Sequence, residues 1–264
     1  MSIYKYMPTH IYNKNDEKIN ILKYIFEDKT LWFSNPLNFN DPFELKPHIE
    51  KIVNDEKHIL LDSFSHHINQ ANEFHYSTVK AILNNIGILS LSENKEHLAM
   101  WAHYANNHKG IVIEFDKKHW FFTKMKLPKY ATVIHNLRKV NYVLKNGRKS
   151  INSNEYFEDK DTYLTKSCDW EYEKEYRMTV YVETNDEYID GIGIKFPTEL
   201  IKSVYIGSKA EKETIKYIKN LKLCDEWKHI DIYKMEIDKK NYKLVSKALI
   251  IKDDIQHFGM NDDI

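Results

Sequence analysis

Polar and apolar residues alternate most clearly in "DWEYEKEYRM", residues 169–178. In an extended chain, successive side chains point to opposite faces of the sheet. One face would therefore carry Glu171, Glu173, Glu175 and Arg177, while mainly aromatic residues occupy the other. In a helix, Glu173 and Arg177 would form an ordinary i,i+4 ion pair instead. The β-forming "TVYVE" that follows continues the alternation, so the pattern predicts one strand over residues 170–183.

The other periodic stretches predict a mixture of strands and helices. Strands are predicted at residues 2–6, 30–34, 87–92, 110–116, 203–208 and 229–237. Helices are predicted at residues 15–28, 53–85, 97–106 and 209–221. The first helix is expected to bury Ile21, Leu22, Ile25 and Phe26. The prediction is an α+β fold with seven or eight strands in mixed, mostly antiparallel sheets and flanking helices.

Composition and charge limit what such a chain binds. The chain has 264 residues, 42% of them hydrophobic, with few glycines and prolines, so we expect a single domain over residues 1–264. Lysine plus arginine equal aspartate plus glutamate at 39 each, so no net field attracts nucleic acid or an anionic membrane. A polyanion would have to meet a local patch, such as Lys124, Lys126 and Lys129 with Tyr130. A solvated lysine face is the simpler explanation of that stripe.

The cysteines and the apolar runs bear on the compartment. Cys168 and Cys224 are too few for a disulfide framework and lack the spacing of a metal site, which suggests a reducing compartment. No apolar run approaches the length of a membrane span, and the first residues lack the apolar core of a signal peptide. We therefore expect a cytoplasmic protein with no membrane partner.

The histidines of "MWAHYANNHKG" raise the question of a metal site. His103 and the histidine five residues later do not share a helix face and no third ligand is suitably spaced, so we expect no metal. We expect Trp101 and Tyr104 to be buried, with His103 hydrogen-bonded to a turn residue such as Asp41 or Glu44. The sequence has no phosphate-cradling glycine loop, Gly-x-Ser-x-Gly elbow or zincin helix.

The glutamate row also has a purely structural explanation. Glu173 and Glu175 on one strand face would repel each other unless cations neutralised them. Arg177, with Lys166 or Lys174, would do so in a salt-bridge network at the rim of the sheet. This explanation stays open beside a functional site.

Five stretches, taken in order, are similar to the bacterial domain of unknown function 2971 family: "IYKY", "LWFSNPLNFNDPFE", "GILSLSE", "MWAHYANNHKGIVIEFD" and "KSCDWEYEKEYRM". The similarity spans residues 3–207, and residues 208–264 are expected to add a C-terminal helix and strands. The order of the motifs also resembles that of ADP-ribosyltransferase folds, whose strands line a cleft for NAD. The resemblance implies an ADP-ribosyltransferase-like fold with NAD as its substrate.

The resemblance assigns catalytic roles to the two glutamates. Glu175 would stabilise the oxocarbenium-like transition state of NAD cleavage. Glu173 would orient an acceptor or take its proton. Because a row of like charges would lose little by dropping one member, we expect Glu175→Gln to leave folding intact.

The same resemblance assigns binding roles to other positions. Lys5 would pair with the diphosphate and Ser34 would hydrogen-bond the nicotinamide ribose, while Tyr6 or Phe39 would stack on the nicotinamide ring. The sequence departs from the stricter pattern because Lys5 lacks the bidentate fork of arginine and "FSNP" replaces the usual "STS". The motifs also suggest supporting positions: Asn40, Asp41, Glu44, Trp101, His103, Tyr104 and Arg177.

Two classes of function follow from these features. One is an NAD-using ADP-ribosyltransferase-like enzyme, for example a toxin or phage-defence effector, that modifies RNA, DNA or protein. The other is a non-catalytic sensor that uses the same cleft for a nucleotide or a partner's segment. An enzyme would consume NAD and release nicotinamide, whereas a sensor would only gain thermal stability on binding its ligand.

Overall fold

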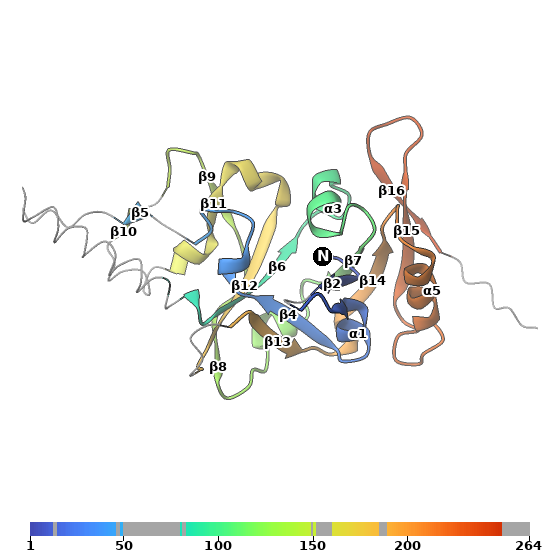
Figure 1. Ribbon diagram of the computed structural model, residues 1–264, viewed down its shortest axis with the longest axis horizontal. Helices are drawn as coiled ribbons and strands as arrows, with labels where there is room; N and C mark the ends of the chain where they lie inside the picture. The colour runs from blue at the N-terminus through green and yellow to red at the C-terminus, as the bar shows by residue number, and fades with distance from the viewer. Residues whose placement is uncertain are drawn as a thin grey trace, which may run out of the picture.

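The computed structural model describes residues 1–12, 15–45, 48–49, 80, 83–148, 150–151, 160–184 and 189–249 (Figure 1). Ten of the described strands form one mixed, mostly antiparallel sheet, and further strand pairs lie outside it. The α+β class predicted from the sequence is confirmed. The helix predicted over residues 53–85 lies almost entirely outside the described residues.

The main sheet follows the order β13 (Gly191–Lys195), β4 (Thr30–Ser34), β6 (Ile86–Ser92), β1 (Ser2–Met7), β7 (Ile111–Asp116), β14 (Ile201–Ile206), β15 (Asp231–Ile237) and β16 (Leu244–Ala248). A branch from β6 adds β12 (Glu175–Val182) and β8 (Ala131–Lys139). The short pairs are β2 (His10–Tyr12) with β3 (Lys18–Asn20), β5 (His48–Ile49) with β10 (Ser150–Ile151), and β9 (Asn141–Val143) with β11 (Thr165–Ser167).

The helices are short. The α-helices are α1 (Ile21–Phe26), α3 (Leu98–Tyr104), α4 (Phe121–Lys124) and α5 (Lys212–Leu221). The 3-10 helices are η1 (Pro36–Asn38), η3 (Lys160–Leu164), η4 (Cys168–Glu173) and η5 (Thr198–Leu200). Helix α5 connects β14 to β15, and these two strands are parallel, as such a crossover requires.

The sheet forks at β6. Strand β12 pairs with the whole length of β6, from Ile86 to Ser92. The other edge of β6 pairs with β4 near Ile88 and with β1 near Ser92. Strands β4 and β1 therefore meet the same edge at different points and diverge from each other. This divergence leaves the edge of β6 around Ser90 open, and the candidate site lies there.

Apolar residues from both sides of the fork meet in one main core. Strands β1, β4, β6, β7, β12 and β14 all contribute fully buried side chains, and α1 and α5 pack against them. The helix predicted over residues 15–28 is shorter than expected, because Asn20 caps the amide of Leu22 and β3 occupies the residues before it. Leu22, Ile25 and Phe26 are buried as predicted, whereas Ile21 is only partly buried.

The single strand predicted over residues 170–183 is wrong in its first half. Residues 168–173 form η4, and the Ser167 side chain caps it by accepting from the amide of Asp169. Lys174 then adopts a left-handed backbone with φ 44°, and β12 begins only at Glu175. Glu171 and Glu173 are therefore not on the strand face that carries Glu175 and Arg177.

The predicted total of seven or eight strands is also too low. Strands β8, β13 and β16 were not predicted, although each is part of the main sheet. Glycines at 191 and 193 conceal the alternation of β13, and His135 and Asn136 interrupt the apolar pattern of β8. Pairing with neighbouring strands, rather than intrinsic preference, fixes these segments.

Candidate functional site

A cavity of about 330 Å³ opens at the fork between β4 and β1. Strands β1, β4, β6 and β12, helix α3 and the turn after η1 all contribute to its walls. The walls include these residues singled out from the sequence: Lys5, Tyr6, Ser34, Phe39, Asn40, His103, Tyr104, Glu173 and Glu175. Residues far apart in the chain therefore meet in one place, which we call the fork cavity.

Lys5 supplies a positive group to the wall formed by β1. Its Nζ donates to the carbonyl oxygen of Ser90 at 3.3 Å, across the open edge of β6. Burial lowers the pKa of Lys5 to about 8 from its ordinary value of 10.5, although the nearby Glu175 opposes that change. Lys5 is thus a cation at pH 7 that loses its proton near pH 8, below the ordinary range of lysine.

Glu175 is held by two cations. Arg177 binds it with two parallel hydrogen bonds, Nε to Oε1 at 2.8 Å and Nη2 to Oε2 at 2.9 Å. Lys166 Nζ lies 3.3 Å from Oε2. Burial opposes ionisation of this carboxyl, but Arg177 and Lys166 outweigh it and lower its pKa to about 2. Glu175 therefore keeps its negative charge throughout the physiological range.

Glu173 has a different environment at the same cavity. Its Oε2 accepts from Lys166 Nζ at 2.7 Å, and its Oε1 accepts from the Tyr104 hydroxyl at 2.5 Å. Tyr104 in turn accepts from Asn40 Nδ2 at 3.2 Å. Burial raises the pKa of Glu173, and Glu175 raises it further, although Lys166 acts in the opposite direction. Glu173 is thus the carboxyl of the pair that takes up a proton more readily.

Behind the cavity wall the two glutamates join a buried ionic network. Arg177 Nη1 also contacts Glu44 Oε1 at 2.7 Å, and Lys166 Nζ lies 3.6 Å from Glu44 Oε2. All five side chains are nearly inaccessible to solvent, and Arg177 is completely so. The network holds three carboxyl groups and two cations, so one negative charge is in excess when all five are ionised.

This network corrects two expectations from the sequence. The salt bridges lie in the interior rather than at the rim of the sheet, because Lys166 and Arg177 are buried. Glu175 is not one of a row of like charges, since its nearest partners are cations. The expectation that Glu175→Gln leaves folding intact therefore loses its premise, because the change removes a charge from a buried network.

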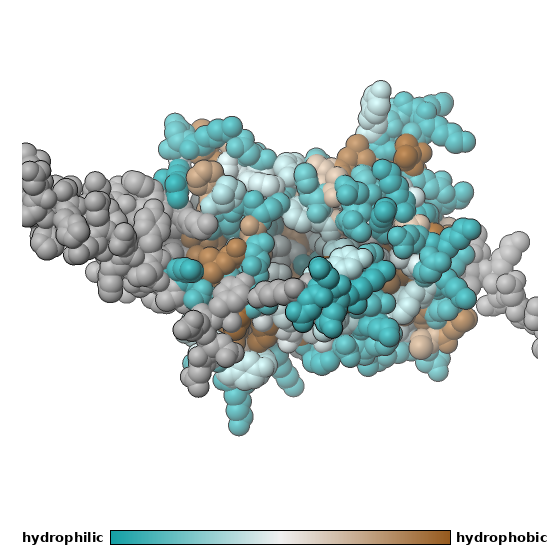
Figure 2. Space-filling model, viewed as in Figure 1, coloured by the Kyte–Doolittle hydropathy of each residue, from teal (hydrophilic) through white to brown (hydrophobic). Residues whose placement is uncertain are grey.

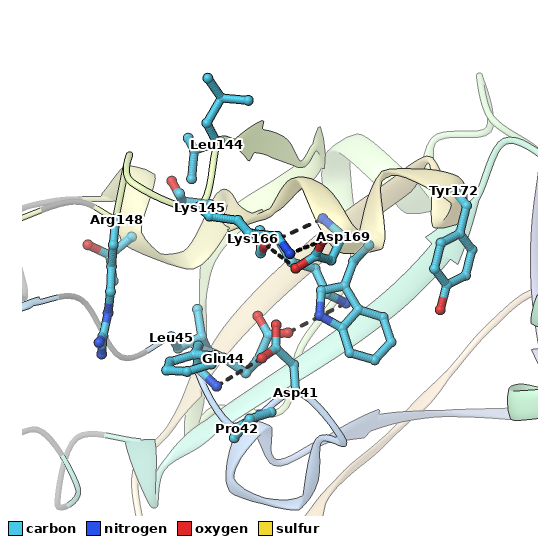
Figure 3. A pocket seen from close by; sticks show the side chains of 16 residues that line it. Asp41, Pro42, Glu44, Leu45, Leu144, Lys145, Arg148, Lys166, Asp169 and Tyr172 are labelled. Atoms are coloured by element: carbon cyan, nitrogen blue, oxygen red, sulfur yellow. Dashed lines mark hydrogen bonds and ion pairs between the residues drawn. The ribbon is translucent and has the colours of Figure 1, made fainter.

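A second cavity of about 520 Å³ is lined by Glu44 and Lys166 of this network (Figure 3). Lys166 lines both cavities, whereas Asp41 and Glu44 line only the second. The charges around the second cavity balance, because it is lined by three acidic and three basic residues. These are Asp41, Glu44 and Asp169, and Lys145, Arg148 and Lys166. The supporting positions Asp41, Glu44 and Arg177 therefore lie outside the walls of the fork cavity.

Helix α3 meets its predicted role only in part. Trp101 is fully buried, and its Nε1 donates to the carbonyl of Lys95. Tyr104 is only partly buried. His103 is exposed and contacts Tyr104 edge to face, and within the described chain it forms no hydrogen bond to the acidic turn. The expected buried hydrogen bond of His103 is wrong, because this helix position faces the opening of the cavity.

Sequence reasoning missed two side chains that shape the site. Lys166 was considered only as a counter-ion for the glutamates, yet it is the group that joins Glu173 to Glu175. Tyr142, whose hydroxyl accepts from the amide of Glu175 at 2.8 Å, lies in β9, a strand that the sequence pattern did not predict. A single sequence gives no signal that a particular lysine is buried, so contacts of this kind emerge only from the fold.

Two properties of the described chain bear on other classes of site. No helix within these ranges is long and apolar enough to cross a membrane. Among the same residues, no group of three or more histidine, cysteine, aspartate or glutamate side chains is placed to hold a metal ion.

Comparison with known families finds a match for the central part of the chain. Residues 100–178 match a family described as "Protein of unknown function (DUF2971)". The matched segment runs from α3 to the beginning of β12 and includes Tyr104, Lys166, Glu173 and Glu175. The match supports the domain-of-unknown-function family suggested by the motifs. No curated protein and no solved structure matches the chain.

Proposed function

We propose that the fork cavity is the active site of an ADP-ribosyltransferase-like enzyme that cleaves NAD at its nicotinamide–ribose bond. The observation that carries this proposal is the meeting of Lys5, Ser34, Glu173 and Glu175 around one cavity. These side chains come from separate elements and supply a phosphate partner, a hydroxyl and two carboxyl groups. An active site is typically concave and contains a few converging polar groups whose pKa values are perturbed.

The two carboxyl groups suit different steps, because their environments move their pKa values apart. Glu175, whose pKa is lowered to about 2, supplies a fixed negative charge to stabilise an oxocarbenium-like ribose. Glu173, whose pKa is raised, suits transfer of a proton to or from an acceptor.

The size of the cavity defines which part of NAD it holds. A volume of about 330 Å³ is at the lower end of small-molecule sites, so it suits the nicotinamide riboside end rather than the whole dinucleotide. In this proposal Lys5 pairs with the diphosphate and Phe39 stacks on the nicotinamide ring, since both side chains line the cavity.

A second candidate is a non-catalytic nucleotide sensor. Both carboxylate oxygens of Glu175 accept hydrogen bonds from Arg177, and one of them also from Lys166. A carboxylate so fully paired has less charge to offer a transition state than one that faces the ligand alone. This observation favours a binding role, which predicts a stabilising ligand but no release of nicotinamide.

Filling the fork cavity tests whether NAD binds there. Ser34 lines the cavity from β4, so Ser34→Phe places a ring in the space intended for the ligand. We expect NAD to raise the melting temperature of the wild-type protein but not of Ser34→Phe. The matched control is Ser246→Phe, at a partly buried position of β16 outside the cavity, which should respond as the wild type does. Equal responses of both variants to NAD would place the binding elsewhere.

The role of Lys5 predicts a pH dependence of NAD affinity. Because its pKa in the free protein is about 8, Lys5 is protonated at pH 7, and about a tenth of it remains so at pH 9. If protonated Lys5 holds the diphosphate, calorimetric titration should show about tenfold weaker NAD binding at pH 9 than at pH 7.

The Lys5→Arg variant is the control for this titration, since arginine keeps its charge at both pH values. Its affinity for NAD should change little between pH 7 and pH 9. Equal affinity of the wild type at both pH values would contradict a role for Lys5 in binding the diphosphate. A fall of the same size in Lys5→Arg would assign the pH dependence to another group.

A further inference from the structure

The hairpin between β15 and β16 ends in a lysine-rich turn. Its sequence over residues 238–243 is "DKKNYK", and it projects at the upper right of Figure 1. The Asp238 carboxylate accepts from the amides of Lys240 at 2.9 Å and Asn241 at 2.7 Å. These bonds lower the pKa of Asp238 and fix the shape of the turn.

The turn presents an aromatic ring and aliphatic surface to solvent beside its lysines. Tyr242 is completely exposed, and Ile237 at the end of β15 is 70% exposed. The surface over this hairpin is otherwise mainly hydrophilic (Figure 2). Tyr242 therefore places a ring that is open to stacking directly beside the lysines of the turn.

A cavity of about 470 Å³ lies beneath the turn, and its charge is strongly one-sided. Lys209, Lys239, Lys240 and Lys243 line it together with a single acidic residue, Asp238. The Asp238 carboxylate is already committed to the backbone of the turn. The chain as a whole has equal numbers of acidic and basic residues, so this concave basic surface is a local feature.

Helix α3 connects this basic surface to the fork cavity. Leu98 lines the basic cavity, whereas Met100, His103 and Tyr104 line the fork cavity. At 3.6 residues per turn, Leu98 lies on the opposite side of the helix from these three residues. The two cavities are thus separated by the thickness of one helix, which is about 10 Å.

We propose that the β15–β16 hairpin and its basic cavity bind single-stranded nucleic acid. Lysines that follow a phosphate backbone, with an aromatic ring on which a base stacks, are the features that bind single strands without sequence preference. Insertion into a lipid surface would call for a larger apolar face than Tyr242 and Ile237 provide. The binding does not require NAD, but it extends the proposed function, because a strand held here passes across α3 to the fork cavity.

Fluorescence anisotropy with a labelled oligonucleotide of about a dozen nucleotides, without NAD, tests this proposal. We expect wild-type binding that weakens steeply between about 50 and 200 mM salt. Replacing Lys239, Lys240 and Lys243 together by glutamate should reduce affinity at least about tenfold. Tyr242→Ala should reduce it about fivefold or more without changing the salt dependence, because it removes stacking rather than charge.

The matched control reverses three lysines of α5, Lys212, Lys216 and Lys219, which carry the same total charge but do not line the basic cavity. This variant should bind within about twofold of the wild type if the hairpin is the site. An equal loss from both triple variants would show only general electrostatic attraction and would overturn the proposal. So would an absence of wild-type binding, or tighter binding to vesicles containing phosphatidylserine than to the oligonucleotide. Because NAD is absent, failure here leaves the proposed NAD chemistry untouched.

Discussion

Replacing Arg177 with methionine should lower the free energy of unfolding by about 3–5 kcal/mol, the range found when one partner of a buried ion pair is removed. Arg177 is fully buried and binds Glu175 and Glu44. Methionine fills much of the same space but leaves both carboxylates without their main partner. Urea denaturation of the purified variant measures this change.

Arg138→Met is the control for this experiment. Arg138 lies opposite Arg177 on the neighbouring strand β8 but is exposed, so its loss should cost well under about 1 kcal/mol. Adding Glu175→Gln and Glu44→Gln to Arg177→Met should recover part of the lost stability, because it removes the unpaired charges. Equal stability of Arg177→Met and Arg138→Met would contradict the buried network.

Replacing Glu175 with glutamine should reduce NAD turnover by about two orders of magnitude or more, the effect of losing one preorganised electrostatic group. Glutamine keeps the shape of the side chain and removes its charge. The variant should also be less stable than the wild type, because Arg177 and Lys166 lose one of the two carboxylates that they share. Turnover must therefore be measured well below the melting temperature of the variant.

Glu44→Gln separates catalysis from stability. Glu44 belongs to the same network and contacts the same two cations, but it does not line the fork cavity. Its replacement should reduce stability while leaving most of the turnover. Parallel losses of turnover in Glu44→Gln and Glu175→Gln would mean that the glutamates act only through the stability of the network.

The strands of the site could be predicted because their patterns are local. Strands β1, β4, β6 and β7 lie within one or two residues of the ranges predicted from alternation and apolar runs. The resemblance of the motifs to ADP-ribosyltransferase folds pointed to Lys5, Ser34 and Glu175, which line one cavity. The alternation by itself singled out only the glutamate row. The meeting of this row with Lys5 and Ser34 depends on how β1 and β4 pair with β6.

The glutamate row shows where periodicity alone fails. The Ser167 cap, just before the alternating stretch, and two acidic residues within it, Asp169 and Glu171, are signals of a helix start. Lys174, in the left-handed conformation, separates the two elements. Glu173 therefore reaches the cavity from a 3-10 helix and Glu175 from a strand. The two carboxyl groups nevertheless meet at Lys166, a contact that depends on tertiary structure.

Release of nicotinamide from NAD by the wild-type protein is the most direct test of the central claim. We predict that the wild-type protein releases nicotinamide, that Glu44→Gln largely keeps this activity, and that Glu175→Gln loses about 99% of it or more. Near-ultraviolet circular dichroism of each protein at the assay temperature would show that all three are folded. No release of nicotinamide by folded wild-type protein, with or without an added oligonucleotide or protein acceptor, would contradict the account. A rise in melting temperature with NAD under those conditions would leave the nucleotide sensor as the function.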